Sequence, residues 1–247
     1  MARTRMLPPE DLEGVPTIEL LGELRRRHNI LSRPPMRAAI LGPPCIGKHT
    51  QAEAFRRAFG VCRVSASEVM AVAAGSSSST GSNDERLVAA VNSYLDQPQC
   101  RRGFVLQGFP TTVAQAERLQ GALEKAQMPI QHAIFLEAAD EQLFERCSGR
   151  SVHEASGRRY HEKFKPPVDE GLDDFTSEPL TRQEISEETT KKISESIARY
   201  REDGSLLRTF FQRTGMVRDV PATGSADAVA TLITSAVTAS SSGDSKS

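Results

Sequence analysis

Residues 36 to 50 read Met-Arg-Ala-Ala-Ile-Leu-Gly-Pro-Pro-Cys-Ile-Gly-Lys-His-Thr, the most informative part of the sequence. A short apolar run enters a loop bounded by Gly42 and Gly47, and a helical apolar pattern then runs from Lys48 to Phe59. A Gly-x-x-x-x-Gly-Lys loop between a strand and a helix binds phosphate through backbone N–H groups, the lysine and the helix N-terminus. We therefore expect a nucleoside di- or triphosphate as the ligand, with Lys48 reaching its terminal phosphoryl groups.

The loop also departs from the general pattern. His49 stands where Ser or Thr is usual, and the hydroxyl of Thr50 follows one position later. Cys45 and Ile46 replace residues whose backbone freedom lets such a loop approach phosphate closely. The residues that we expect to contact the nucleotide here are Gly42, Gly47, Lys48, His49 and Thr50.

Short apolar runs alternate with helical patterns along the rest of the chain. The strands that we expect are Arg37–Leu41, Val61–Val64, Gly103–Gln107, Ala133–Leu136 and Met216–Val220. The helices that we expect are Lys48–Phe59, Asp84–Leu95, Thr112–Gln127, Glu141–Cys147, Glu184–Arg201 and Ala226–Val237. This alternation predicts an α/β fold of three layers around a five-stranded parallel sheet, with Arg37–Leu41 central and ligands at the carboxyl ends of the strands.

The two ends of the chain have a different character. Residues 1–35 form a Pro-rich extension in which Thr17–Ile30 is expected to be helical, because Ile18, Leu20, Leu21 and Leu24 bunch at helical spacing. That apolar stripe either packs on the core or docks a protein partner. The main domain is expected over residues 36–239, and the Ser-rich residues 240–247 are expected to be disordered.

Composition excludes several classes of function. The chain has 247 residues, 38% of them apolar, which is enough for one substantial core. The net charge of −1 gives no electrostatic case for nucleic-acid or membrane-surface binding. Its four cysteines are scattered without evident pairs, as is typical of a reducing compartment. With neither a secretory apolar core nor a spanning run, the sequence favours a soluble cytoplasmic protein.

Further motifs follow the phosphate loop in a fixed order. Gly103-Phe-Val-Leu-Gln-Gly-Phe-Pro110 precedes a helical stretch that contains Gln115-Ala116. Gly149-Arg150 precedes Val152-His153, and Ser156-Gly-Arg-Arg-Tyr-His161, Pro166-Pro167, Asp173-Asp174 and Arg182 come next. In this order and spacing, residues 37–239 resemble adenylate kinases and their nucleoside monophosphate kinase relatives.

The resemblance implies a nucleotide phosphotransferase that uses ATP with Mg²⁺. Lys48, Arg150 and Arg182 match catalytic cations of that family, and Arg146 and Arg150 match arginines around the triphosphate. Thr50 matches a residue near the β-phosphate and Mg²⁺. Planar guanidinium groups suit bidentate contacts to phosphate. No metal ion bound by protein side chains alone is expected.

Residues 149–181 resemble the lid of that family, a small subdomain over ATP. The segment has no cysteine, so we expect no zinc. His153, Ser156, Asp173 and Thr176 match the polar set that replaces the metal in zinc-free lids, and we expect these side chains to hydrogen-bond to one another.

Several positions depart from the family pattern on the side that holds AMP. Gln107 stands in place of an Asp that orients water around Mg²⁺, and Thr111 stands in place of an Arg that bridges the two phosphates. Ala66 and Ala71 replace a Thr and an Arg that hold AMP, and Ile193 replaces another phosphate-binding Arg. The monophosphate-binding region is shortened to about residues 66–83, with Ala74–Asn83 expected as a loop.

Two classes of function follow from these matches and losses. One is a phosphotransferase of the ATP plus AMP to ADP type with weak catalysis. The other is a non-catalytic ATP- or ADP-binding scaffold or sensor, held in a flagellar or other cytoskeletal assembly through residues 17–30. The flagellar location rests only on an analogy with adenylate-kinase-like domains that carry extra N-terminal helices.

Overall fold

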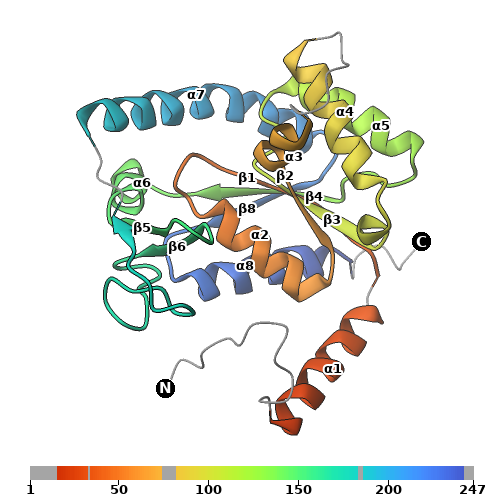
Figure 1. The fold of residues 1–247 in the computed structure, drawn as a ribbon. Helices are drawn as coiled ribbons and strands as arrows, with labels where there is room; N and C mark the ends of the chain where they lie inside the picture. Colours follow the sequence, from red (N-terminus) through yellow and green to blue (C-terminus); the bar gives the residue numbers. More distant parts are fainter. Residues whose placement is uncertain (1–15, 33, 74–81, 183–185, 242–247) are drawn as a thin grey trace.

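The computed structural model describes residues 16–32, 34–73, 82–182 and 186–241 (Figure 1). Its centre is a parallel sheet of five strands in the order β2-β3-β1-β4-β8. These strands are β1 Met36–Leu41, β2 Cys62–Ser65, β3 Gly103–Gln107, β4 His132–Glu137 and β8 Val217–Pro221. β1 pairs with β3 on one side and with β4 on the other, which confirms the five-stranded parallel sheet with β1 at its centre.

Helices cover both faces of this sheet (Figure 1). They are α2 Lys48–Phe59, α3 Ala66–Ala73, α4 Asn83–Leu95, the short 3-10 helix η1 Pro98–Cys100, α5 Val113–Lys125, α6 Asp140–Cys147, α7 Glu187–Gln212 and α8 Ala226–Ser241. One core cluster joins the sheet to α3, α4, α5 and the end of α7, and a second joins it to α2, α6 and α8. The strands alternate side chains between these clusters, because successive residues of a strand point to opposite faces. The three-layer prediction is therefore confirmed.

Two helices, α7 and α3, differ most from the sequence-based expectation. α7 continues eleven residues beyond Arg201, because Leu207 and Phe211 bury an apolar face against the core. Gly204 lies inside this helix, although a glycine usually weakens a helix. The Tyr200 ring packs over it, and a Cβ at position 204 would be 3.2 Å from the nearest ring atom. α3 was not predicted, because its eight residues are too short for a clear periodic signal.

The region between α3 and α4 is described only at its edges. Ser82 caps α4 by accepting a hydrogen bond from the Glu85 N–H, and the Glu85 carboxylate accepts one from the Ser82 N–H. Asn83 is therefore helical and not part of a loop. The rest of the expected loop, residues 74–81, lies outside the described residues. So do residues 242–247 of the expected disordered tail, while α8 extends to Ser241.

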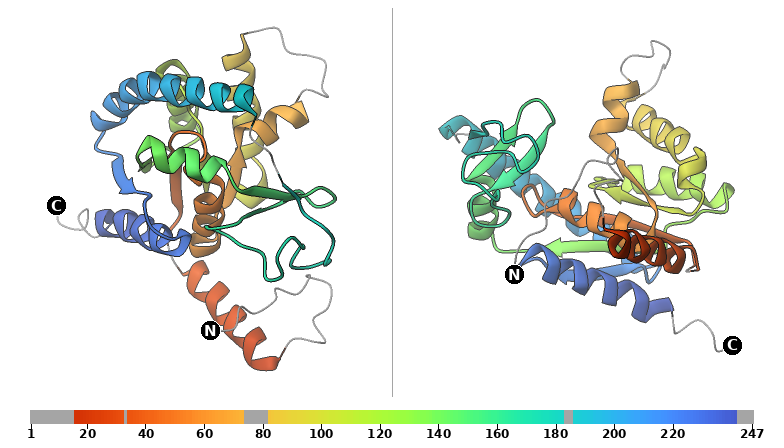
Figure 2. Two further views of the ribbon diagram at one scale, coloured as in Figure 1. Left: turned by 90° about the vertical axis from the view of Figure 1, so that its left-hand side faces the viewer. Right: turned by 60° about the horizontal axis from the view of Figure 1, so that its bottom comes forward.

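The predicted lid is a three-stranded antiparallel sheet in the order β6-β5-β7. Its strands are β5 Arg150–His153, β6 Arg158–His161 and β7 Thr181–Arg182. It follows α6 directly and lies to one side of the main sheet (Figures 1 and 2). This confirms a small subdomain attached to the core.

The N-terminal helix α1, Thr17–Leu31, is attached at its C-terminal end and projects from the domain (Figure 2). Ile30 is buried, and a Cβ on Gly60 would come within 2.2 Å of the Ile30 Cγ2 atom, so the glycine makes room for this side chain. Arg102 donates a 2.7 Å hydrogen bond to the Ile30 carbonyl, and Arg26 donates one to the Arg57 carbonyl on α2. The remaining apolar stripe of α1 is largely exposed.

The cysteines are paired, contrary to the sequence-based expectation. Cys45 bonds Cys147 and Cys62 bonds Cys100. The partners are 102 and 38 residues apart, so only the folded chain brings them together. The cysteines therefore give no support for a reducing compartment. Within the described ranges, no helix is long and apolar enough to cross a membrane.

Candidate active site

The phosphate loop connects β1 to α2 at the carboxyl edge of the sheet. Gly42 is required by close packing, because a Cβ there would come within 3.0 Å of Ile46 and 3.2 Å of the Leu136 carbonyl. Gly47 begins α2 with a φ of 98°, a conformation that glycine adopts without strain. Cys45 has a φ of 63°, which is uncommon for a residue with a side chain. Its disulfide to Cys147 holds the loop in this conformation.

Lys48 lies under its own loop and does not extend into solvent. Its ammonium donates hydrogen bonds of 2.8 Å to the Gly42 carbonyl and 2.7 Å to the Pro43 carbonyl. Burial, with a further contribution from the charge of Arg150, lowers the pKa of Lys48 to about 8. Gly108 lies directly over the lysine stem, since a Cβ at this glycine would be 3.2 Å from Lys48 Cε. A half-buried cation without a carboxylate partner among the described residues favours an anionic ligand.

Two arginines reach the loop from the α6 and lid side. Arg150 donates a 3.0 Å hydrogen bond through Nε to the Arg146 carbonyl, and burial followed by the charge of Arg159 lowers its pKa. Arg146 donates to the Ile46 carbonyl of the loop at 3.0 Å and to the Ala222 carbonyl after β8. Its guanidinium therefore ties the phosphate loop to the segment before α8.

Arg182 lies apart from this group. It is exposed on β7, and its guanidinium is 3.1 Å from the Glu162 carboxylate. His49 and Thr50 lie in the first turn of α2, as expected, where the helix N-terminus favours anions. Burial, followed by the charges of Arg63 and Arg159, lowers the pKa of His49.

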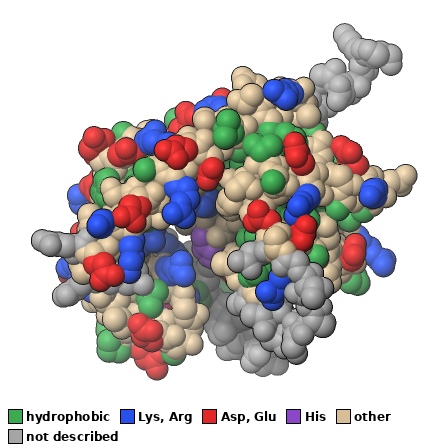
Figure 3. Space-filling view, turned by 90° about the horizontal axis from the view of Figure 1, so that it is seen from above, with side chains coloured by type: hydrophobic (Ala, Val, Ile, Leu, Met, Phe, Trp, Pro, Cys, Tyr) green, Lys and Arg blue, Asp and Glu red, His purple; other side chains and the backbone are tan. Residues whose placement is uncertain are grey.

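The structure brings Lys48, His49 and Arg150 to one region of the molecule, and it places Arg182 outside it. Figure 3 shows a hollow with a histidine at its edge and several Lys and Arg side chains gathered along one side. The sequence-based prediction missed Arg63 and Arg159. Arg63 belongs to no motif that is visible in sequence, and Arg159 lies within the Ser156–His161 motif, where the sequence-based analysis gave it no role.

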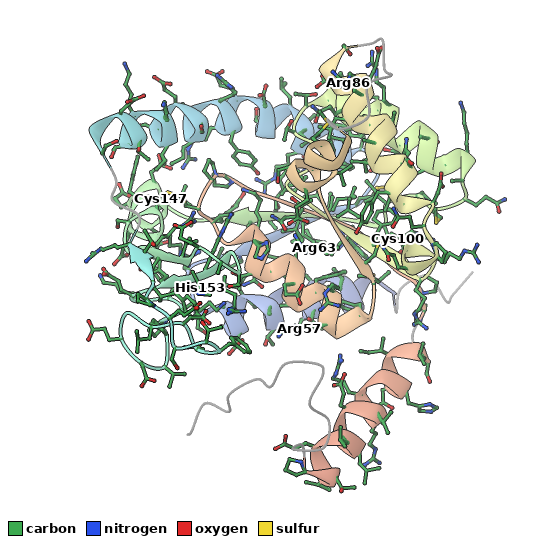
Figure 4. All side chains as sticks on the ribbon, in the orientation of Figure 1. Arg57, Arg63, Arg86, Cys100, Cys147 and His153 are labelled. Carbon is green, nitrogen blue, oxygen red and sulfur yellow. A yellow bond between two sulfur atoms is a disulfide. The ribbon has the colours of Figure 1, made fainter. Side chains whose placement is uncertain are left out.

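Arg63 pairs with a residue that differs from the family pattern. It donates a 2.7 Å hydrogen bond to the Gln107 side-chain oxygen at the end of β3 and contacts the Glu68 carboxylate at 2.9 Å. The amide of Gln107 thus accepts from a cation, as a carboxylate would, but it carries no charge. In Figure 4 Arg63 lies beside α2.

The polar set of the lid forms one connected network (Figure 4). His153 contacts Ser156 at 2.7 Å and Glu178 at 2.6 Å through its two ring nitrogens. The buried Asp173 carboxylate accepts from Arg158 at 2.6 Å, and from Tyr160 and Thr176. The Arg158 guanidinium, with burial opposing it, holds the pKa of Asp173 far below its usual range. The expected contacts are confirmed, and Glu178, Arg158 and Tyr160 are additions. In the described part of the chain, no group of three or more metal-ligating side chains is present.

Comparison with known proteins identifies the family. The model of the adenylate kinase family matches residues 40–216. The chain is 35% identical to adenylate kinase 4 of Arabidopsis thaliana over 70% of its own length and 75% of that protein. It is also 35% identical to an adenylate kinase of Aspergillus oryzae, covering 76% of this chain and 77% of that protein. The chain belongs to the adenylate kinase family. As a member of the adenylate kinase family it is a nucleotide phosphotransferase by descent, and that family uses ATP with Mg²⁺.

In this adenylate kinase relative, two of the positions that differ from the family pattern, Thr111 and Ile193, make local structural contacts. The Thr111 hydroxyl and N–H both donate to the Gln115 side-chain oxygen, at 2.9 Å each. Ile193 packs against the core cluster of α2 and α8. Ala66 and Ala71 lie on α3, directly after β2. None of these four residues carries a charge for an acceptor phosphate.

Proposed function

We propose that this protein binds ATP with Mg²⁺ at the phosphate loop and transfers the terminal phosphoryl group slowly to AMP or a similar monophosphate. The observation that carries the proposal is the half-buried, hydrogen-bonded Lys48 near Arg150, contrasted with the uncharged Thr111 and Ile193. An acceptor oxygen attacks the γ-phosphorus, the bond to the β-bridging oxygen breaks, and ADP leaves. Enzymes catalyse this step by positioning and by neutralising charge, so missing cations slow it.

Mg²⁺ would neutralise phosphate charge and bridge the phosphoryl oxygens when it is bound with the nucleotide. Among the residues named here, one side chain suits such an ion. Thr50 offers a hydroxyl oxygen in the first turn of α2, which suits a hard cation that keeps several water molecules. The Gln107 side-chain oxygen accepts from Arg63, so it is already used by a cation. Thr50 and the nucleotide itself are therefore the ligands that we assign.

Lys48 has a direct role in this scheme. Its two hydrogen bonds go to neutral carbonyls, so it can exchange them for charged phosphoryl oxygens, which are stronger acceptors. Arg150 contributes a second cation at the same place. We propose that Arg146 acts mainly by holding the loop through the Ile46 carbonyl, and that Arg182 contacts nucleotide only when the lid moves.

A non-catalytic ATP- or ADP-binding sensor is the second candidate. It is favoured by the hydrogen bonds of Thr111, which commit this position to the start of α5. A coupled assay for ADP formation from ATP and each monophosphate separates the two, with Lys48→Met as the blank. A rate no higher than that of Lys48→Met supports the sensor, and a slow rate above that of Lys48→Met supports the enzyme. A rate of about 10 s⁻¹ or more, the ordinary enzyme range, contradicts the weak catalysis that we propose.

The partner and the location are proposals as well. We propose that α1 docks a protein partner, because Ile18, Leu21 and Leu24 are 75%, 55% and 62% exposed. Deleting residues 1–34 should leave ATP binding unchanged and abolish partner capture or localisation. We propose a cytoplasmic location, with the flagellum as the alternative, and microscopy of the tagged full chain tests it.

A further inference from the structure

The two disulfides of the described chain differ in how easily a reductant can reach them. Cys45 is half-buried, whereas Cys147, Cys62 and Cys100 are buried. Thiol–disulfide exchange begins when a thiolate attacks a sulfur atom of the bond, so access to that sulfur helps to decide which bond reacts. Access through Cys45 makes its bond to Cys147 the more reducible of the two. The other bond, between β2 and η1, is protected because both of its cysteines are buried.

The half-buried cysteine is also part of the phosphate loop. Cys45 has a φ of 63°, and a residue with a side chain stays in this left-handed conformation only where the surrounding structure holds it. The bond to Cys147 provides such a restraint. The same loop carries the Gly42 and Pro43 carbonyls, which accept hydrogen bonds of 2.8 and 2.7 Å from Lys48. The disulfide therefore restrains the loop that positions the lysine.

A second link between the loop and α6 lies beside the disulfide. Arg146 donates a 3.0 Å hydrogen bond to the Ile46 carbonyl, and each of these residues is next to a bonded cysteine in the chain. Arg150 donates a 3.0 Å hydrogen bond to the Arg146 carbonyl. A covalent bond and a hydrogen bond thus join the loop to the segment that carries both arginines. Reduction removes the covalent link and leaves a hydrogen bond that can break and re-form.

We propose that the Cys45–Cys147 bond is a thiol–disulfide exchange site that controls nucleotide affinity, and that its reactant is a dithiol. This inference rests on the proposed binding of ATP at the phosphate loop. A thiolate of the dithiol attacks the Cys45 sulfur to form a mixed disulfide, and Cys147 leaves as a thiolate. The second thiol then attacks the dithiol's own sulfur in the mixed disulfide and releases Cys45. The dithiol is oxidised to a disulfide by loss of two electrons, and its two protons complete the cysteine thiols.

Reduction and ATP binding are coupled in this scheme. The oxidised protein holds the loop in the conformation that binds nucleotide, and the reduced protein lets it relax. Bound ATP must make the bond harder to reduce by the same factor by which reduction weakens ATP binding, because coupling between two sites is reciprocal. Such a role suits the proposed cytoplasmic location, where disulfides are usually transient and have catalytic or redox-sensing roles.

The first test is calorimetric titration of ATP into the full-length protein, either oxidised or reduced with dithiothreitol. We expect the reduced protein to bind ATP about fivefold or more weakly, as for ordinary coupling between two sites. Circular dichroism at the same temperature should show equal helix content in both states. Equal ATP affinity in the two states overturns the inference, and so does a loss of helix on reduction, which would make the bond purely structural. Absence of ATP binding by the oxidised protein instead overturns the proposed function.

The two cysteine pairs provide matched variants for this titration. Cys62→Ser/Cys100→Ser keeps the proposed exchange site, and dithiothreitol should weaken its ATP binding as it does for the wild type. Cys45→Ser/Cys147→Ser should bind ATP weakly with or without dithiothreitol. A redox response that disappears with the Cys62–Cys100 pair and persists without the Cys45–Cys147 pair overturns the inference.

Alkylation of free thiols, read by mass spectrometry, tests the exchange without any variant or turnover assay. At limiting dithiothreitol, the label should appear first on Cys45 and Cys147. Saturating ATP should raise the ratio of reduced to oxidised dithiothreitol at which Cys45 is half labelled, by the factor that separates the two ATP affinities. Labelling that begins at Cys62 or Cys100 overturns the exchange site. Half-labelling that ATP leaves unchanged overturns its control of nucleotide affinity.

Discussion

Cys45 of the phosphate loop and Cys147 at the end of α6 form a disulfide, with their Cα atoms 5.4 Å apart (Figure 4). Cys147 lies three residues before Arg150, where the lid begins. The bond therefore fastens the nucleotide loop to the base of the lid. It also closes the longer of the two disulfide loops in the described chain, and the restriction that it places on the unfolded chain grows with loop length.

Replacing Cys147 with Ser should lower the free energy of unfolding by about 2–4 kcal/mol, because the unfolded chain regains the freedom of the long loop. ATP affinity should also fall, since Cys45 is no longer held in its left-handed conformation. Urea denaturation with and without a phosphine reductant measures the first effect. The Cys62→Ser/Cys100→Ser variant is the control for the other bond. This control keeps only the Cys45–Cys147 bond. If the reductant leaves its unfolding midpoint unchanged, that bond does not stabilise the fold.

Lys48→Met should abolish stabilisation by ATP while making the nucleotide-free protein more stable near pH 7. The folded-state pKa of Lys48 is about 8 against an ordinary value of 10.5, so the unfolded chain binds more protons between these values. The charged Lys48 therefore lowers the free energy of unfolding by its full amount below pH 8, and this loss becomes smaller as the pH rises to 10.5.

Thermal unfolding of Lys48→Met and wild type at pH 7 and pH 10 measures this difference, which should shrink at the higher pH. Lys125→Met, which removes an exposed lysine at the end of α5, is the control and should show no such pH dependence. A destabilised Lys48→Met at pH 7 would show that the lysine supports the empty loop.

Thr111→Arg should raise phosphotransferase turnover by about tenfold or more, since it places a cation near the acceptor phosphate. The Thr111 N–H keeps its hydrogen bond to Gln115 whatever the side chain, so the start of α5 should survive. Thr111→Met is the uncharged control of comparable length. Ile193→Arg should instead destabilise the fold, because Ile193 packs against the core. Equal rates for the arginine and methionine variants would exclude the missing cation at position 111 as the cause of slow turnover.

Asp173→Asn should loosen the lid and leave the core intact. The Asp173 carboxylate accepts hydrogen bonds from Arg158, Tyr160 and Thr176, and the amide cannot replace the charge. Because its folded-state pKa is depressed, the contribution of Asp173 is complete above its ordinary pKa and is lost only in strong acid.

Hydrogen exchange at pH 7 should therefore show lower protection over residues 150–182 in Asp173→Asn, with β1 and β4 unchanged. Glu154→Gln, which alters an exposed residue of the same lid, provides the comparison. Unchanged protection in the lid would mean that the network adds nothing to its order.

The triple variant Ile18→Ala/Leu21→Ala/Leu24→Ala should unfold at the wild-type denaturant concentration. These side chains are more than half exposed, so their truncation removes little buried apolar area. Ile30→Ala is the contrasting variant, since Ile30 is buried against Gly60 and its truncation should release α1. A stability loss of the triple variant comparable to that of Ile30→Ala would refute the docking role.

Local patterns predicted most of the fold. β3 and α2 have the predicted bounds, because Gly103 and Gly47 mark their beginnings and the apolar pattern is unbroken. The prediction was less accurate where packing overrides local signals, as at Gly204 within α7. The site was predictable where residues lie in motifs, as with Lys48 and Arg150. Arg63 has no such signal, since its hydrogen bond to Gln107 joins two strands that are far apart in sequence.

Patterns of neighbouring residues were enough to predict the elements of the parallel sheet, the phosphate loop, the lid and the family. The tertiary structure decided what depends on distant residues. It paired Cys45 with Cys147 and Cys62 with Cys100, placed Lys48 under its loop, and gave Gln107 an arginine partner. Contacts between residues far apart in sequence form only when the whole chain packs, so no local pattern records them.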